Sequence, residues 1–206
     1  ESLEPELLER MPVFARRMQW FYDNKVYLKE DGHLACTRTP GVGERRLLSL
    51  VNEDRLRSML RYMLDETEFL SPHGIRSVSK YHAEHPYHFH AGGETFSIAY
   101  QPAESQSGMF GGNSNWRGPV WFPINFLLVE ALQRFHHYHG DTFTVEYPTG
   151  SGREYSLDTI AAELSRRLTA IFQRDGAGHR PVFGGNERLQ QDPQWRDYIL
   201  FHEYFH

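Results

Sequence analysis

The chain has 206 residues, of which 39% are hydrophobic and 14% aromatic, and its formal net charge is -5. This length and composition suit a globular protein with one sizeable core or two small ones. The balance is mildly acidic, and the positive charges are spread along helical stretches instead of forming one basic block. No apolar run approaches the roughly 18 to 20 residues of a membrane span. We therefore expect neither nucleic acid nor a membrane as a partner.

Two amphipathic helices are predicted in the first third of the chain. Over residues 3–24, apolar side chains recur at spacings of three and four, which predicts a helix despite Pro12. Asn52 precedes two acidic residues and is a plausible helix start, and this second helix should extend to about Leu64. Its predicted buried stripe consists of Leu56, Met59, Leu60 and Met63.

A hairpin is predicted over residues 86–102, where alternating side chains flank Gly92 and Gly93. His88 and His90 lie in this range, and His82 and His85 lie shortly before it. Two histidines on one strand face can bind a metal, but no carboxylate cluster stands beside them in the sequence. We interpret them as solvated hairpin residues and expect no metal and no cofactor.

The helix predicted over residues 119–140 differs from the others. Pro119 suits a first helical position and Gly140 suits a stop. From Val120 to Leu132 apolar residues occur on nearly all sides, which is typical of a helix surrounded by protein. Inner and outer helices joined by long loops indicate a mainly α, layered arrangement with small β-hairpins inserted in the loops.

The last regular elements follow in the C-terminal third. A second hairpin is predicted over residues 143–157, around a turn rich in glycine. A helix should then run from Ser156 or Asp158 to Arg174. Its apolar side consists of Ile160, Leu164, Leu168 and Ile171.

The stretch "GMFGGNSNWRGPVWFPIN" lies at the entrance of the apolar helix and combines aromatic rings, amides, glycines and a guanidinium. Sugar rings stack their C–H faces on tryptophan, and their hydroxyls form bidentate hydrogen bonds with amide and guanidinium groups. The alternative is a glycine-rich loop whose tryptophans pack in the core and whose arginine pairs with a carboxylate. The predicted sugar contacts are Trp116, Arg117, Gly118, Trp121, Asn125, Phe110 and Gly111.

The chain ends on "FHEYFH", in which His202, Glu203 and His206 form the H-E-x-x-H pattern of zinc peptidases. Such a site needs both histidines on one face of a helix and a third ligand further along the chain. The segment is aromatic with no helical continuation, so an extended or irregular conformation is at least as plausible. A zinc peptidase therefore remains the weaker alternative.

Five stretches of the sequence resemble the C-terminal catalytic domain of glycoside hydrolase family 63. They are "TPGVGERRLLSLVNEDRL", "GIRSVSKYH", "PAESQSGMFGGNSNWRGP", "NWRGPVWFPINFLLVEAL" and "RDYILFHEYFH", which together span nearly the whole chain. The resemblance implies an (α/α)6 toroid. A toroid has about twelve helices, and the chain shows about half of them. We therefore expect residues 1–206 to be the C-terminal portion of a single such domain, truncated at both ends.

The resemblance also implies a mechanism. Glu203 falls where the family places the general base of an inverting hydrolysis, and an aspartic acid upstream of Glu1 would be the general acid. The two carboxyl groups of inverting enzymes stand roughly 6.5 to 9.5 Å apart. The family raises the expectation that Arg76, in "GIRSVS", touches substrate.

Several further expectations follow from this resemblance. The intact protein would hydrolyse an oligosaccharide or small glycoside, with α-linked glucosides or mannosides favoured. The chain would be inactive without the remaining part of its own catalytic domain. With no visible signal peptide, the expected compartment is the cytoplasm. A carbohydrate-binding module that kept the fold and lost catalysis is the alternative from another functional class.

Overall fold

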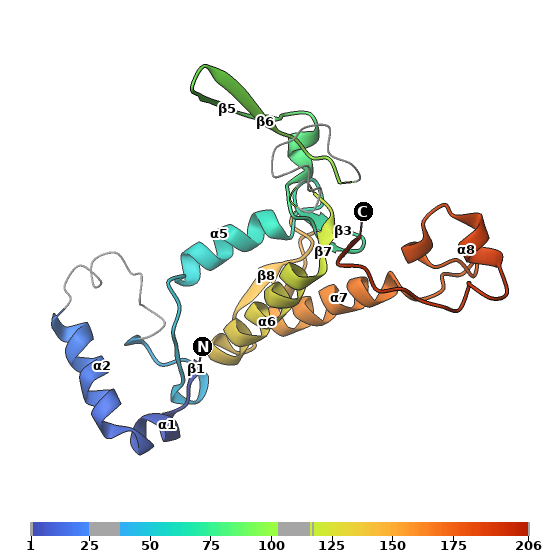
Figure 1. Ribbon diagram of the computed structural model, residues 1–206. Coiled ribbons are helices and arrows are strands. Elements are labelled where there is room, and N and C mark those ends of the chain that lie inside the picture. Colours follow the sequence, from blue (N-terminus) through green and yellow to red (C-terminus); the bar gives the residue numbers. More distant parts are fainter. Residues whose placement is uncertain (1, 25–37, 103–115, 117, 206) are drawn as a thin grey trace.

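The computed structural model describes residues 2–24, 38–102, 116 and 118–205. Helices predominate in these residues (Figure 1), as the sequence predicted. The α-helices are α1 (Pro5–Arg10), α2 (Pro12–Asn24), α5 (Glu53–Met63), α6 (Phe122–His139), α7 (Leu157–Ala170) and α8 (Glu187–Gln191). Short 3-10 helices are η1 (Val42–Glu44), η2 (Lys80–Ala83) and η5 (Pro181–Phe183).

The strands form antiparallel pairs and no larger sheet within the described residues. Both predicted hairpins are confirmed, as β5 (Tyr87–Ala91) with β6 (Glu94–Ile98) and β8 (Thr144–Glu146) with β9 (Glu154–Ser156). A third hairpin joins β3 (Leu70–Ser71) to β4 (Gly74–Ile75). Two pairs join distant segments, namely β1 (Ser2–Leu3) with β2 (Arg46–Leu47) and β7 (Val120–Trp121) with β10 (Tyr204–Phe205).

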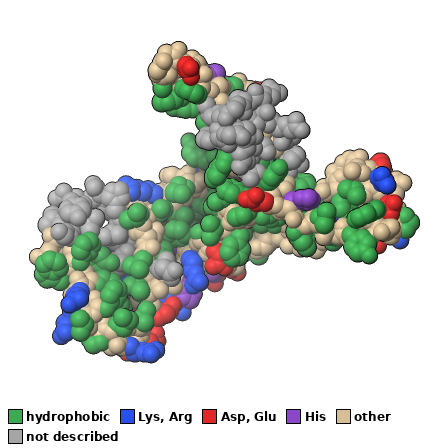
Figure 2. Space-filling model, viewed as in Figure 1, with side chains coloured by type: hydrophobic (Ala, Val, Ile, Leu, Met, Phe, Trp, Pro, Cys, Tyr) green, Lys and Arg blue, Asp and Glu red, His purple; other side chains and the backbone are tan. Residues whose placement is uncertain are grey.

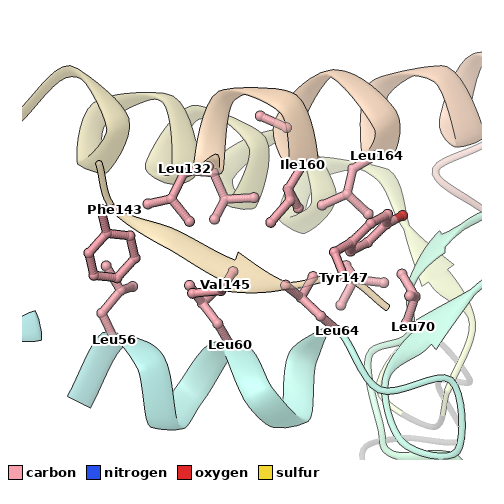
Figure 3. Close-up of a cluster of buried hydrophobic side chains, with 13 residues drawn as sticks. Leu56, Leu60, Leu64, Leu70, Leu132, Phe143, Val145, Tyr147, Ile160 and Leu164 are labelled. Atoms are coloured by element: carbon pink, nitrogen blue, oxygen red, sulfur yellow. The ribbon is translucent and has the colours of Figure 1, made fainter. Parts of the chain in front are cut away.

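The main core lies between α5 on one side and α6 and α7 on the other, with β8 between them (Figure 3). We call this set of buried side chains the core cluster. Burial of apolar side chains stabilises a fold by roughly 25 cal/mol per Å² removed from water. Its members are Leu56, Leu60, Leu64, Leu70, Ile75, Leu132, Phe143, Val145, Tyr147, Leu157, Ile160, Ala161 and Leu164.

The helix starts of the core follow the predicted caps. The side chain of Asn52 accepts a hydrogen bond from the Arg55 amide at 3.0 Å, and Ser156 accepts one from Thr159 at 3.4 Å. Such caps satisfy amides that have no partner within the helix. The helix α7 ends at Ala170, four residues before the predicted end.

Further details of the predicted helices are wrong. Pro119 is not the first residue of a helix, because Val120 and Trp121 form β7 and α6 begins at Phe122. The helix expected over residues 3–24 is two helices, because Met11 leaves the helical conformation and Pro12 begins α2. Proline restricts the residue before it and cannot donate its amide, so it favours a helix start over a helix interior. Met59 is 58% exposed and does not belong to the buried stripe of α5.

Within the described chain, protein does not surround α6 on all sides. Leu132 is 3% exposed, whereas Phe126 is 62% and Leu127 58% exposed. Exposed apolar side chains also gather over α1 and α2 (Figure 2), where Val13 is 52% and Trp20 62% exposed. Among the described helices, none combines the length and the apolar character needed to cross a membrane.

Candidate functional site

The pairing of β7 with β10 brings the last residues of the chain to the first turn of α6. Tyr204 pairs with Trp121, and Phe205 pairs with Val120. The amide of Phe122 also donates to the carbonyl oxygen of Glu203 at 2.9 Å. The prediction of an extended or irregular segment at the end of the chain is thus confirmed. The pairing places Glu203 beside the sequence stretch that carries the predicted sugar contacts.

A hydrogen bond joins the indole of Trp121 to the carboxylate of Glu203. Nε1–H of Trp121 donates to Oε1 of Glu203 at 2.9 Å. Trp121 in turn contacts Trp116 edge to face, with ring centroids 4.5 Å apart and an interplanar angle of 76°. Trp116 is 46% exposed. The fold therefore brings together three residues that the sequence singled out, and it presents an aromatic surface beside an oriented carboxylate.

Close packing explains why position 118 is a glycine, without any contact to a ligand. Its φ is +124°, and a Cβ at this position would lie 2.3 Å from ring atoms of Tyr100. Its amide donates to Oγ of Ser77 at 2.9 Å. A side chain at this buried position would collide with the Tyr100 ring, so close packing accounts for the glycine.

Asn125 is 2% exposed and bonds to backbone instead of facing solvent. Its Oδ1 accepts the amide of Ile75 at 2.7 Å, and its Nδ2 donates to the carbonyls of Ile75 at 2.9 Å and Trp121 at 3.0 Å. Gly74 is adjacent, and a Cβ there would lie 2.9 Å from Oδ1 of Asn125. The structure gives Asn125 the role of fastening β4 to α6, where the sequence predicted a sugar contact.

Arg76 is partly buried, and its guanidinium donates to carbonyl oxygens of its own loop. Nη1 contacts the carbonyl of Leu70, and that of Glu68 lies at 3.4 Å. Arg76 also lines a pocket of about 180 Å³ together with His73 and Phe205. Burial, with a smaller contribution from a nearby arginine, lowers the pKa of His73. This pocket therefore brings an imidazole and an arginine side chain together with Val120 of β7 and Phe205 of β10.

The remaining predicted contacts, Phe110, Gly111 and Arg117, lie outside the described residues, as does His206. The zinc alternative can be examined only in part. The residues after Glu203 form β10, whereas a zinc-peptidase motif requires a helix. The described part of the chain contains no group of three His, Cys, Asp or Glu side chains placed to hold a metal ion.

A pocket of about 420 Å³ includes Glu203 among its lining residues, and we call it the Glu203 pocket. Its walls come from the first residue of α6, the two residues directly after α7, the η5 loop and the last segment of the chain. Sequence analysis missed the aromatic residues Phe172 and Phe183 in these walls. In the sequence, both look like ordinary core phenylalanines. The only further signal is the pair of glycines that follows Phe183 in the η5 loop.

Sequence comparison relates the chain to carbohydrate-active proteins. The model of the family described as "Mannosylglycerate hydrolase MGH1-like glycoside hydrolase domain" matches residues 18–192, a range that includes the tryptophan stretch and ends before Glu203. The Saccharomyces cerevisiae protein YMR196W is 48% identical over 206 residues, covering 99% of this chain and 19% of the yeast protein.

A probable mannosyl-oligosaccharide glucosidase of Schizosaccharomyces pombe is 33% identical over 89 residues, covering 42% of this chain and 8% of that protein. The chain thus spans less than a fifth of the length of these two relatives. No solved structure matches the chain.

Proposed function

Since this chain belongs to the MGH1-like glycoside hydrolase domain family, which is related to glycoside hydrolase family 63, we propose that the intact protein is an inverting O-glycosidase. One observation carries the proposal for the site. The carboxylate of Glu203 accepts a hydrogen bond from Trp121 at 2.9 Å, beside the exposed ring of Trp116. Aromatic faces suit stacking against a sugar ring, and an inverting hydrolysis uses one carboxylate as its general base.

In the proposed reaction Glu203 is the general base. A water molecule attacks the anomeric carbon and gives one proton to the carboxylate while the bond to the leaving oxygen breaks. An aspartic acid from another part of the intact domain gives a proton to that oxygen. The indole of Trp121 holds Oε1, so we assign the water to the other carboxylate oxygen.

The other residues of the site have distinct proposed roles. Trp116 offers a ring face to the sugar, and Trp121 orients the base. Asn125 and Gly118 support these residues from behind, because their own contacts are with the protein. Arg76 supports the underlying loop. Arg117, Phe110 and Gly111 remain predicted sugar contacts.

The substrate class follows from the names of the family and of one relative. The family takes its name from a mannosylglycerate hydrolase, and the Schizosaccharomyces pombe relative is named as a glucosidase. We therefore propose α-linked mannosides or glucosides as substrates. The product would be the sugar with its anomeric configuration inverted.

We also propose that further helices of the same domain cover the exposed side of α6, as in an (α/α)6 toroid. Phe126 and Leu127 support this, since apolar side chains of this size are 62% and 58% exposed on a helix that is otherwise half-buried. Completing the site would then require the general acid from those helices. The isolated chain is accordingly expected to be inactive.

The test is a screen of the intact protein against α-glucosides and α-mannosides, with the anomeric protons of the product followed by NMR. The proposal predicts release of a sugar that is the β-anomer when first formed. Release of the α-anomer would contradict the inverting mechanism. Absence of hydrolysis across both substrate classes would contradict the proposed activity.

A further inference from the structure

Another pocket, of about 480 Å³, lies between the β8–β9 hairpin and α7, and it shares no described lining residue with the Glu203 pocket. Glu163 in this pocket lies eight residues before Ile171 of the Glu203 pocket, which is about 12 Å along a helix axis. We propose that this pocket, which we call the hairpin pocket, binds a small organic carboxylate that carries an apolar body. The proposal does not depend on the activity assigned to Glu203.

Tyr147 brings to the hairpin pocket a buried hydroxyl group that has no hydrogen-bond partner among the described residues. The residue is 7% exposed and reaches from the hairpin toward α7 (Figure 3). Burial raises the pKa of Tyr147, so the hydroxyl keeps its proton. A buried hydroxyl without a partner destabilises a fold, and phenylalanine would fill nearly the same space without that cost. The hydroxyl is therefore free to donate to a ligand.

Arg153 brings an unpaired positive charge to the same side of the hairpin. Within the part of the chain that the structure describes, its side chain has no hydrogen bond or ion pair. The amide of Tyr147 donates to the carbonyl of Arg153 at 2.9 Å, and Glu146 pairs with Glu154. Because side chains alternate along a strand, Tyr147, Arg153 and Tyr155 share one face. Glu146 and Glu154 lie on the opposite face, where they line a different pocket.

The carboxylate of Glu163 also lines the hairpin pocket, but its charge is already paired. Arg166 donates to its two oxygens at 2.6 and 2.7 Å, and Arg167 donates to one of them at 3.1 Å. The hydrogen-bonding capacity that remains, from Tyr147 and Arg153, consists of donors. A guanidinium binds a carboxylate through two parallel hydrogen bonds, and one guanidinium matches one negative charge. The free groups of the pocket therefore favour a carboxylate.

The apolar part of such a ligand has a wall to pack against. Pro148 and the partly buried ring of Tyr155 line the hairpin pocket beside Tyr147. The ring of Tyr155 meets that of Tyr147 edge to face, with centroids 6.2 Å apart. The guanidinium of Arg167 lies 5.5 Å from the centroid of the Tyr147 ring. These contacts hold the rings in place, and the volume lies within the roughly 300 to 1,000 Å³ of small-molecule sites.

Polar surface surrounds the hairpin pocket. Asp158, Thr159 and Arg166 are exposed on this side of α7, and Ser151 is exposed at the tip of the hairpin. This surface differs from that of α6, on which large apolar side chains are exposed. A polar surface is typical of a side that faces solvent in the folded protein. We therefore expect the hairpin pocket to be accessible in the intact protein.

The experiment measures binding of sodium benzoate to the intact protein by saturation-transfer NMR, with benzamide as the uncharged ligand of the same shape. We expect a Kd for benzoate of roughly 1 mM, in keeping with its size. Benzamide should bind at least about tenfold more weakly. Arg153→Gln should weaken benzoate binding about tenfold, because the ionic hydrogen bonds are lost. Arg188→Gln, at an exposed position of α8, is the matched control and should leave the affinity unchanged.

Tyr147→Phe tests the hydroxyl without disturbing the fold. It should weaken benzoate binding about fivefold, because one hydrogen bond to the ligand is lost. The thermal unfolding midpoint should not fall, since the hydroxyl has no described partner within the protein.

Equal affinities for benzoate and benzamide would overturn the proposal, as would the absence of benzoate binding. A benzoate affinity that is unchanged in Arg153→Gln or in Tyr147→Phe would also overturn it, because the anion would then bind elsewhere. A lower unfolding midpoint in Tyr147→Phe would show that its hydroxyl serves the fold and would contradict the assignment. Hydrolysis of glycosides by the same proteins tests the proposed function separately and does not influence these results.

Discussion

Along α6, Leu132 is 3% exposed within the core cluster, whereas Phe126 and Leu127, nearer the site, are 62% and 58% exposed. The first region is apolar and closed by α5 and α7. The second combines exposed rings with the Glu203 carboxylate and joins segments that are far apart in sequence. Stability is therefore expected to reside mainly in the core cluster, and the proposed chemistry is placed at the β7 and β10 pair.

The largest effect on stability is expected in the core cluster. Leu164 is 1% exposed, so Leu164→Ala leaves a cavity and should lower the free energy of unfolding by roughly 2 to 5 kcal/mol. Leu127→Ala, with the same chemical change on an exposed side chain, should cost less than about 0.5 kcal/mol in the chain alone. Urea unfolding measures both. Equal losses of unfolding free energy in the two variants would contradict the claim that stability resides mainly in the core cluster.

Asn125 connects the two regions, and its replacement should cost less than the core cavity. Asn125→Ala leaves the buried amide and carbonyl of Ile75 without partners, which should cost roughly 1 to 3 kcal/mol of unfolding free energy. The measurement is again urea unfolding, with Gln133→Ala on an exposed position of α6 as control. Unchanged stability in Asn125→Ala would contradict the role of fastening β4 to α6.

Trp121→Phe should separate activity from stability. The variant keeps an aromatic ring but loses the Nε1–H that donates to Glu203. We expect a loss of about 10- to 100-fold in kcat, because the base is no longer held in one orientation. The substrate KM and the unfolding free energy should change little. A kcat equal to that of the wild type would show that the hydrogen bond from Trp121 to Glu203 does not contribute to catalysis.

The smallest effect concerns Glu163, at the edge of the core. Hydrogen bonds from Arg166, and next from Arg167, lower the pKa of Glu163 to about 2. Because the folded-state pKa is lowered, the stabilisation is present above the ordinary pKa of 4.5 and is lost as the pH falls from 4.5 toward 2. Glu163→Gln should flatten the pH dependence of stability in this window. Identical profiles for both proteins would contradict this assignment.

Local signals predicted much of the fold. The capping residue Asn52, the alternation around Gly92 and Gly93, and the apolar spacing of α7 each specify their own elements. The pairing of β7 with β10 could not be predicted in the same way. It depends on contacts between residues 120–121 and 204–205, and no periodicity within either short segment specifies the partner.

The same distinction applies to the candidate site. Trp116, Trp121 and Glu203 were found from residue chemistry and family resemblance, and the fold brings them together. Sequence reasoning placed Asn125 with them, because it cannot tell which face of an apolar helix an amide occupies. The walls of the Glu203 pocket were missed because a phenylalanine beside a ligand and one in a core have the same sequence signature.

The central claim is that Glu203 is the catalytic base. The most direct test compares the intact wild-type protein with Glu203→Gln in hydrolysis of the α-glycoside identified by the product screen. We predict a loss of at least about 100-fold in kcat, since general bases contribute roughly 10²- to 10⁴-fold. Binding of the sugar should survive, because glutamine keeps the shape of the side chain. Undiminished hydrolysis by the variant would contradict the account.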